Sequence, residues 1–113
     1  MTTPSGPDLA AVITLIDEHA DKRLSVPELA RYARVSVRWL QRRFQEELGV
    51  SPNAYIRLTR LRRIHEDLLA GDPEAGCTVE AVTSRWGVRH CGRFAAWYRS
   101  HYDELPSATL HRR

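Results

Sequence analysis

The sequence predicts an all-α protein of about seven helices, in which two helix-turn-helix lobes are joined by a long central helix. Apolar residues follow a helical period, and no segment alternates as a strand would. The stretch SVRWLQRRF at residues 36–44 recurs in its spacing 54 residues later as HCGRFAAWY, each copy behind a short helix signal and a turn. The apolar-periodic segment between the copies is about 18 residues long, or about 27 Å as a helix.

Capping residues and breakers define the first lobe, expected over about residues 8–51. Residues 1–7 hold two prolines and a glycine and read as a disordered tail or linker. A first helix should start at Asp8, because apolar residues from Leu9 follow the i, i+3, i+4, i+7 pattern. Ser25 with a glutamate three residues later forms a capping box that opens a short helix. Ser36 should cap the next helix, which should end at Gly49.

The central helix and the second lobe follow from the same kind of signal. Ser51-Pro52 should begin the central helix, over about residues 52–70, with proline near its first position. After a loop, the second lobe should cover about residues 76–111. Thr78 caps its short helix, His90 precedes its long helix, which should run to about residue 102, and Pro106 opens a last turn.

Charge is concentrated on the two repeated segments, although the net charge is only +3. Residues 22–63 carry eleven basic residues against three acids, and residues 85–113 carry six arginines against two acids. Such a distribution favours a polyanionic partner. A solvated arginine-rich surface is the alternative interpretation.

Several functional classes lack sequence support. We find no nucleophile motif, no glycine-rich phosphate loop and no paired acids in a recognisable pocket, so we expect no catalytic residues, no cofactor and no enzymatic activity. Two cysteines form neither a CxxC pair nor a disulfide framework, and the histidines lack zinc-ligand spacing, so no metal site is expected. No apolar run approaches the roughly 20 residues of a membrane span. A cytoplasmic protein without a membrane partner is the default.

Three segments resemble the AraC/XylS family of bacterial transcription regulators, over about residues 9–110. They are LSVPELARYARVSVRWLQRRFQEELGVSP from Leu24, YIRLTRLRRIHEDLL from Tyr55, and TVEAVTSRWGVRHCGRFAAWYRSHYDELP from Thr78. The resemblance implies that the second helix of each helix-turn-helix enters the major groove of double-stranded DNA, with the protein bound in the nucleoid. It also suggests RNA polymerase and an N-terminal sensor or dimerisation domain as partners.

The third segment departs from the family pattern at Thr83, Val88, His90 and Asp103, where alanine, phenylalanine, serine or aspartate, and glycine are usual. Together these departures indicate a divergent second lobe.

The polar face of residues 37–48 holds the first candidate DNA readers. At 100° per residue, the polar side chains lie opposite the apolar cluster of Val37, Leu40, Phe44 and Leu48. Arginine can bind guanine O6 and N7, and glutamine can bind adenine N6 and N7. The four polar residues of this face are Arg38, Gln41, Arg42 and Gln45. The family match also implies that the first three of them are base-reading positions. An ordinary solvated helix face is the alternative.

The second long helix has fewer side chains that can read bases. The wheel places Cys91, Phe94, Tyr98 and Tyr102 inside, and the positions that match the reading face are Gly92, Ala95, Ala96 and Arg99. Small residues allow close approach and contact with thymine methyls. We therefore expect base or edge contacts from Arg89, His90 and Arg93 instead.

The phosphate-contact candidates are Ser36, Arg43, Arg60 and Arg99. Arg60 is equally compatible with a structural role between the lobes, and Trp39 is better explained by packing than by a nucleic-acid contact. The overall expectation is sequence-specific binding of double-stranded DNA by a domain at residues 8–111. The first lobe specifies sequence, and the second adds mainly backbone and methyl contacts. A protein-interaction module on the same scaffold, with weak DNA binding, is the alternative.

Overall fold

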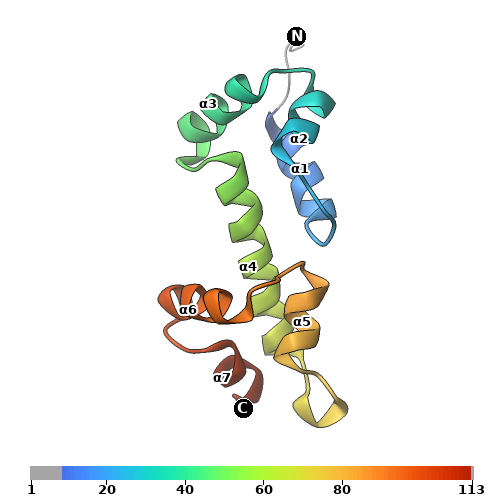
Figure 1. Ribbon diagram of the computed structural model, residues 1–113, viewed down its shortest axis with the longest axis vertical. Coiled ribbons are helices and arrows are strands. Elements are labelled where there is room, and N and C mark those ends of the chain that lie inside the picture. Colours follow the sequence, from blue (N-terminus) through green and yellow to red (C-terminus); the bar gives the residue numbers. More distant parts are fainter. Residues whose placement is uncertain (1–8, 113) are drawn as a thin grey trace. The chain divides into compact units, whose positions relative to one another are not determined.

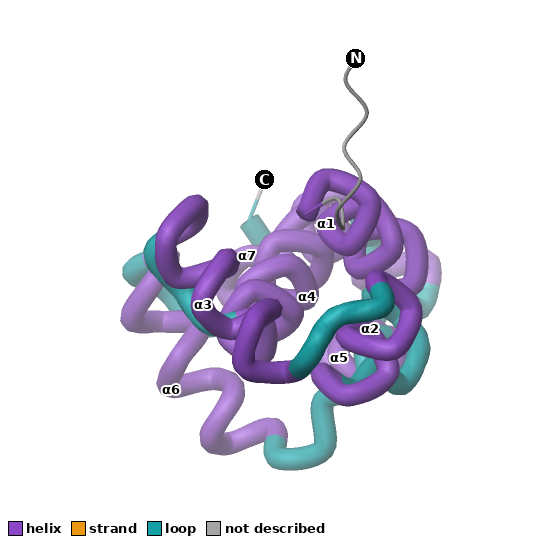
Figure 2. The backbone as a smooth tube through the Cα atoms, turned by 90° about the horizontal axis from the view of Figure 1, so that it is seen from above, coloured by secondary structure: helices purple, strands orange, loops and turns teal. Residues whose placement is uncertain are grey.

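Helices make up most of the chain, which the computed structural model describes over residues 9–112. No strand occurs within that range (Figures 1 and 2). The elements in order are α1 (Leu9–His19), α2 (Val26–Ala33), α3 (Val37–Leu48), α4 (Pro52–Ala70), a 3-10 turn η1 (Pro73–Ala75), α5 (Val79–Arg85), α6 (Cys91–Tyr102) and α7 (Pro106–His111). The predicted fold class is confirmed. The expected tail at residues 1–7 and the expected start at Asp8 lie outside the described residues.

Side-chain caps begin four of the helices. The hydroxyl oxygens of Ser25, Ser36 and Thr78 accept the backbone N–H three residues later, at 3.2, 2.9 and 3.0 Å. Ser51 does the same for the N–H of Ala54 at 3.1 Å. Each of these bonds satisfies a donor that the first helical turn leaves without an intrahelical partner. Gly49 ends α3 in the left-handed conformation, with φ at 73°.

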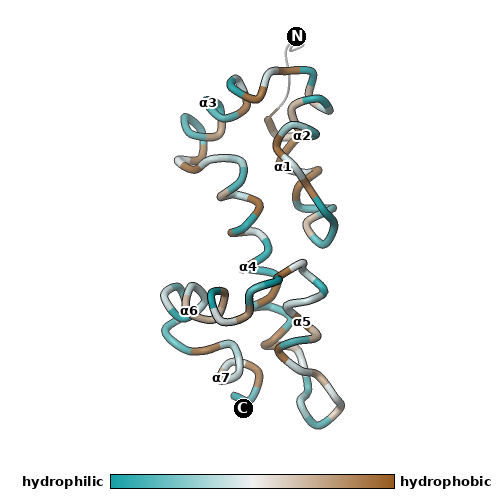
Figure 3. The backbone as a smooth tube through the Cα atoms, in the orientation of Figure 1, coloured by the Kyte–Doolittle hydropathy of each residue, from teal (hydrophilic) through white to brown (hydrophobic). Residues whose placement is uncertain are grey.

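The chain divides into an N-terminal unit, up to Thr59, and a C-terminal unit, from Arg60 onward. Helix α4 runs from one into the other. In the N-terminal unit, α1, α2, α3 and the start of α4 surround one apolar cluster, and hydrophobic positions recur along these helices (Figure 3). The buried members of that cluster are Val12, Ile16, Leu29, Ala30, Leu40, Phe44 and Ile56.

The C-terminal unit buries threonine and tyrosine together with aliphatic side chains. Its buried residues include Leu61, Ile64, Leu68, Val82, Thr83, Phe94, Tyr98, Thr109 and Leu110. The Thr83 hydroxyl donates to the carbonyl oxygens of Val79 and Glu80, at 2.9 and 3.2 Å. Threonine is therefore accommodated at this position because the helix itself satisfies its hydroxyl.

Two predicted core positions at helix ends are wrong. Cys91 is exposed, and Leu48 is 39% exposed. Cys91 is the first residue of α6 and Leu48 is the last residue of α3. The helical wheel assigns a direction to a side chain but does not say where along the helix the core stops.

The turns of the two helix-turn-helix segments differ by one residue. In both, a residue with positive φ follows the short helix, Arg34 at 61° and Gly87 at 80°. The next N-cap is Ser36, eleven positions after Ser25, in the first segment, but it is His90, twelve positions after Thr78, in the second. The His90 side chain makes no capping bond. Helix α6 therefore begins without the side-chain cap that α3 has.

This difference predicts unequal costs of truncation. Ser36→Ala should lower the free energy of unfolding of the N-terminal unit by about 1 kcal/mol, because the Trp39 N–H loses its acceptor. His90→Ala should change stability by less than about 0.5 kcal/mol, since no capping bond is lost. Urea titration followed by circular dichroism measures both, and equal losses in the two variants would contradict the assignment of caps.

Candidate DNA interface

Helix α3 presents a polar face that is open to solvent. Arg38, Gln41, Arg42 and Gln45 are all exposed, whereas Leu40 and Phe44 on the other side are fully buried. Within residues 9–112, these four polar side chains form no hydrogen bond or ion pair. Their donors and acceptors are thus available to an external partner, with no internal contact to break first. The structure brings the four predicted base readers together on one helix face.

Arg43 is held within its own helix. Its guanidinium donates to Glu47 at 2.9 Å, lies 3.9 Å from a Glu46 oxygen, and sits 5.7 Å from the centre of the Trp39 ring. Trp39 is half-buried against the apolar cluster, as the packing interpretation expects. Residues 39, 43 and 47 are four positions apart, and this spacing predicts side-chain contacts along one face of a helix. An exposed pair of this kind contributes only about 0.3–0.5 kcal/mol, so Arg43 can still turn toward a phosphate.

Ser36 is also engaged, but only as an acceptor. Its hydroxyl oxygen receives the Trp39 N–H, which leaves the hydroxyl proton free to donate to a phosphate at the start of α3. Its capping role and its predicted phosphate contact are therefore compatible.

Helix α6 presents a very different face at the equivalent positions. Gly92 and Ala96 are exposed, Ala95 is half-buried, and a Cβ added at Gly92 would meet nothing within 4 Å. The nearby candidates Arg89, His90 and Arg93 are exposed, and their side chains form no hydrogen bond or ion pair in the described part of the chain. They lie in the loop before α6 and in the first turn of that helix, so they do not form a continuous polar face like that of α3.

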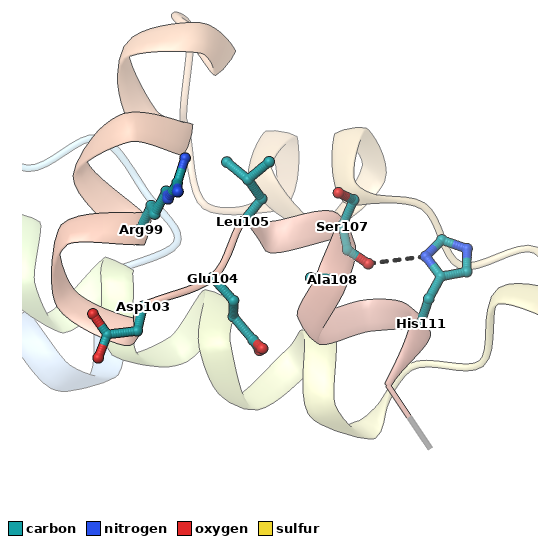
Figure 4. A pocket seen from close by; sticks show the side chains of 7 residues that line it. All are labelled: Arg99, Asp103, Glu104, Leu105, Ser107, Ala108 and His111. Atoms are coloured by element: carbon teal, nitrogen blue, oxygen red, sulfur yellow. Dashed lines mark hydrogen bonds between the residues drawn. The ribbon is translucent and has the colours of Figure 1, made fainter.

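Arg99 lines a hollow of about 420 Å³ at the end of α6 and along α7 (Figure 4). Its guanidinium lies apart from the carboxylates of Asp103 and Glu104, which line the same hollow (Figure 4). No ion pair of Arg99 occurs within residues 9–112. This leaves the charge of Arg99 available to an external anion, and its phosphate contact stays a prediction.

A second hollow lies beside the first half of α6. It measures about 310 Å³ and its lining is mainly apolar, formed by Val79, Thr83, Cys91, Gly92, Phe94, Ala95, Leu105, Pro106 and Ser107. Leu105 is 44% exposed at its rim. The small side chains of α6 therefore open onto a concave apolar surface in the C-terminal unit.

Arg60, like Arg43, is less exposed than the other two phosphate candidates, Ser36 and Arg99. Its side chain is half-buried, and this burial lowers the pKa of its guanidinium from the ordinary value. Partial burial is compatible with both roles of Arg60, so its structural role and its phosphate contact stay predictions.

Asp67 on α4 holds the turn of the second helix-turn-helix, a role that the sequence did not indicate. Its carboxylate accepts from the Arg85 guanidinium at 3.0 Å and from the Trp86 indole N–H at 2.8 Å. The Arg63 guanidinium lies 5.7 Å from the centre of the Trp86 ring. No motif links position 67 to positions 85 and 86, so only the tertiary structure places these residues together.

Two further findings concern ligands and membranes. Among the described residues, no three histidine, cysteine, aspartate or glutamate side chains are grouped so that they could bind a metal ion. Nor does any helix between residues 9 and 112 combine the length and apolar character needed to span a bilayer.

Comparison with known proteins identifies the family. A family model described as a helix-turn-helix domain matches residues 29–112. A probable AraC family transcriptional regulator from Rhodopseudomonas palustris has a similar structure, with a TM-score of 0.82 and 30% identity over 92% of this chain and 94% of that one. The chain belongs to the AraC/XylS family. Members of this family are transcription regulators rather than enzymes.

Other AraC/XylS relatives are longer than this chain. The XylDLEGF operon transcriptional activator 1 of Pseudomonas putida is 38% identical over 108 residues, covering 95% of this chain and 32% of the relative. The probable thc operon regulatory protein of Rhodococcus erythropolis is 36% identical over 108 residues, covering 92% and 32%. This chain thus spans about a third of the length of these relatives. The DNA-binding domain of AdpA, solved in complex with a target DNA, matches with a TM-score of 0.80 and 27% identity over 94% and 91% of the chains.

Proposed function

We propose that residues 8–111 form a domain that binds double-stranded DNA sequence-specifically within a transcription regulator, and that its two lobes do so unequally. In this proposal, α3 reads bases, while α6 adds mainly backbone and methyl contacts. The observation that carries it is the contrast between two helix faces. The exposed polar side chains of α3 have no hydrogen-bond or ion-pair partner within residues 9–112, whereas the equivalent positions of α6 hold glycine and alanines. The DNA-binding domain of the relative AdpA, which has a similar fold, was crystallised in complex with a target DNA.

The side chains of α3 match the major-groove edges of the bases. Arg38 and Arg42 can each present two N–H groups to guanine O6 and N7, and Gln41 can pair with adenine N6 and N7. Each good bidentate pair gives about 1–3 kcal/mol of discrimination against the wrong base. Gln45 lies one turn further along the same face and extends the reading surface.

The side chains of α6 support a different division of labour. Gly92, Ala95 and Ala96 have no hydrogen-bonding side chains, so direct readout from these positions is limited to contact with thymine methyls. Arg93, Arg89 and His90 surround them with donors for base edges, and Arg99 is placed for a phosphate. The C-terminal lobe therefore contributes affinity more than sequence preference.

The family resemblance extends this proposal to the rest of the regulator. It suggests RNA polymerase as a further partner and an N-terminal sensor or dimerisation domain acting with the DNA-binding domain. We place such a regulator in the bacterial cytoplasm, bound at the nucleoid.

The apolar hollow beside α6 favours a second candidate function. A concave surface lined by Cys91, Phe94 and Ala95 is suited to an apolar side chain from another protein, such as polymerase or a co-regulator. In that case the scaffold would be an interaction module with weak DNA binding.

Binding to random duplex DNA at two salt concentrations discriminates between these functions. If about six to ten phosphates are neutralised, affinity should fall by about 10³–10⁵ between about 50 and about 200 mM salt. A mobility-shift titration measures this fall. Absence of any shift at the lower salt concentration would favour the interaction module.

Arg42→Ala tests the reading face of α3. At a site selected from a random duplex library, it should cost about 1–3 kcal/mol of binding free energy and relax preference at one base pair. Arg23→Ala removes the same charge from an exposed position outside α3 and α6, so it serves as the control. Equal losses in both variants, with base preference retained, would remove Arg42 from the reading surface.

Unequal readout predicts an asymmetric binding site. In a complete set of single-base substitutions in the selected site, penalties of about 1–3 kcal/mol should cluster in the part contacted by the N-terminal lobe. The part contacted by the C-terminal lobe should tolerate most changes. Equally strong base preference in both parts would be incompatible with the proposal.

A further inference from the structure

A hydrogen-bonded chain connects α4, α6 and α7 inside the C-terminal unit. The Nδ1 of His65, on α4, lies 2.8 Å from the Tyr98 hydroxyl on α6, and that hydroxyl donates to Thr109 on α7 at 2.8 Å. The Thr109 hydroxyl donates to the carboxylate of Glu104, which lies 3.4 Å from the Arg112 guanidinium. Tyr98 and Thr109 are almost fully buried. The middle of this series of hydrogen bonds is therefore shielded from solvent.

The direction of donation fixes the tautomer of His65. Each hydroxyl carries one proton, and the protons of Thr109 and Tyr98 are already given to Glu104 and Thr109. His65 must therefore donate from Nδ1, which leaves Nε2 as the unprotonated nitrogen of the neutral ring. Burial raises the pKa of the Tyr98 phenol, so its proton stays in place. A second proton on His65 can enter only at Nε2, which leaves the bond from Nδ1–H to Tyr98 in place. Protonation therefore acts on α6 by placing a positive charge on a half-buried ring.

The surroundings of His65 disfavour that second proton. Its ring is stacked on Tyr102 of α6, with centroids 3.8 Å apart and planes 1° from parallel. Burial lowers the pKa of His65 from its ordinary value of 6.5, and the nearby positive charge of Arg112 lowers it further. Glu104 and Glu66 raise it, but these effects are smaller than that of burial. Burial raises the pKa of Tyr102, the charge of Arg62 lowers it, and the charge of Glu66 raises it.

The corresponding position of the N-terminal unit lacks the tyrosine hydroxyl on which this series of hydrogen bonds depends. The residue at the position of Tyr98, 54 residues earlier, is Phe44, which packs edge-on against Tyr55 of α4 with centroids 5.7 Å apart. Phe44 has no hydroxyl, and the cluster around it is apolar. Protonation of a residue on α4 can thus disturb the packing of α6 while leaving that of α3 intact.

We propose that His65 is a positioning residue whose neutral ring holds α6 against α4, so that acidification weakens the contribution of the C-terminal lobe to DNA binding. This inference rests on the proposed function, since α6 must contribute to affinity for the effect to appear in binding. Because the neutral form is favoured in the folded state, the stabilisation is complete above about pH 6.5 and is lost as the pH falls below that value.

The test compares the full chain with His65→Asn and with His101→Gln. The asparagine amide can take the place of the Nδ1–H donor and carries no charge at either pH. His101 is an exposed histidine of the same helix, outside the hydrogen-bonded chain. Affinity for a duplex selected from a random library is measured at about pH 7.5 and about pH 5.5. Between these values the wild type and His101→Gln should lose more affinity than His65→Asn, because only a neutral side chain at position 65 escapes protonation at the lower pH.

A proton NMR titration of the free protein separates this inference from the proposed function. The His65 ring should titrate below 6.5, and amide shifts of α6 should follow it while those of α3 do not. If no duplex binds but α6 follows His65, the proposed DNA binding fails and the positioning role stands. If His65 titrates at or above 6.5, if α6 does not respond, or if His65→Asn keeps the wild-type pH dependence of binding, the positioning role is overturned.

Discussion

The constraint on which the rest of the structure depends is that one helix, α4, supplies core residues to both units. Tyr55 and Ile56 at its start pack into the apolar cluster of the N-terminal unit, whereas Ile64 and Leu68 near its end are buried in the C-terminal unit. Such packing is the main source of stability for α4, a helix of 19 residues, because most helical stability in proteins comes from tertiary packing of an amphipathic face. Each helix-turn-helix is therefore completed by its own part of α4, and the side chains on that part determine how its long helix is held.

The two parts of α4 hold α3 and α6 through different interactions. In the N-terminal unit, α3 is held by close packing of apolar side chains, which is insensitive to pH and has no directional preference. In the C-terminal unit, polar contacts from α4 add direction: Asp67 fixes the turn through Arg85 and Trp86, and His65 fixes the inner face of α6 through Tyr98. Buried polar networks specify geometry only when every member is satisfied. The second unit therefore gains orientation at the cost of sensitivity to the protonation state of one histidine.

Most of the fold was predictable from the sequence because its signals are local. Caps at Ser36 and Thr78, the stop at Gly49 and the helical period act within a few residues, and the predicted helices were confirmed. The helical wheel wrongly predicted that Cys91 and Leu48 are buried, because the tertiary structure determines where along a helix the core ends. The hydrogen-bonded chain joins residues 65, 98, 104 and 109, and no local rule relates positions so far apart. The candidate readers on α3 were predictable as an exposed face, but the DNA contacts assigned to them and to α6 stay predictions.

An unequal division between the lobes is energetically sufficient for a specific binder. Three bidentate pairs from α3, at about 1–3 kcal/mol each, would provide about 3–9 kcal/mol of discrimination. Specific complexes are typically favoured over non-specific ones by about 4–10 kcal/mol, so readout by one lobe approaches the required range. The second lobe is then free of the need for base-reading side chains, and glycine and alanine at its contact face cost little specificity. Control exerted on α6 through His65 would consequently change how tightly a site is held, while the sequence preference set by α3 would be unaffected.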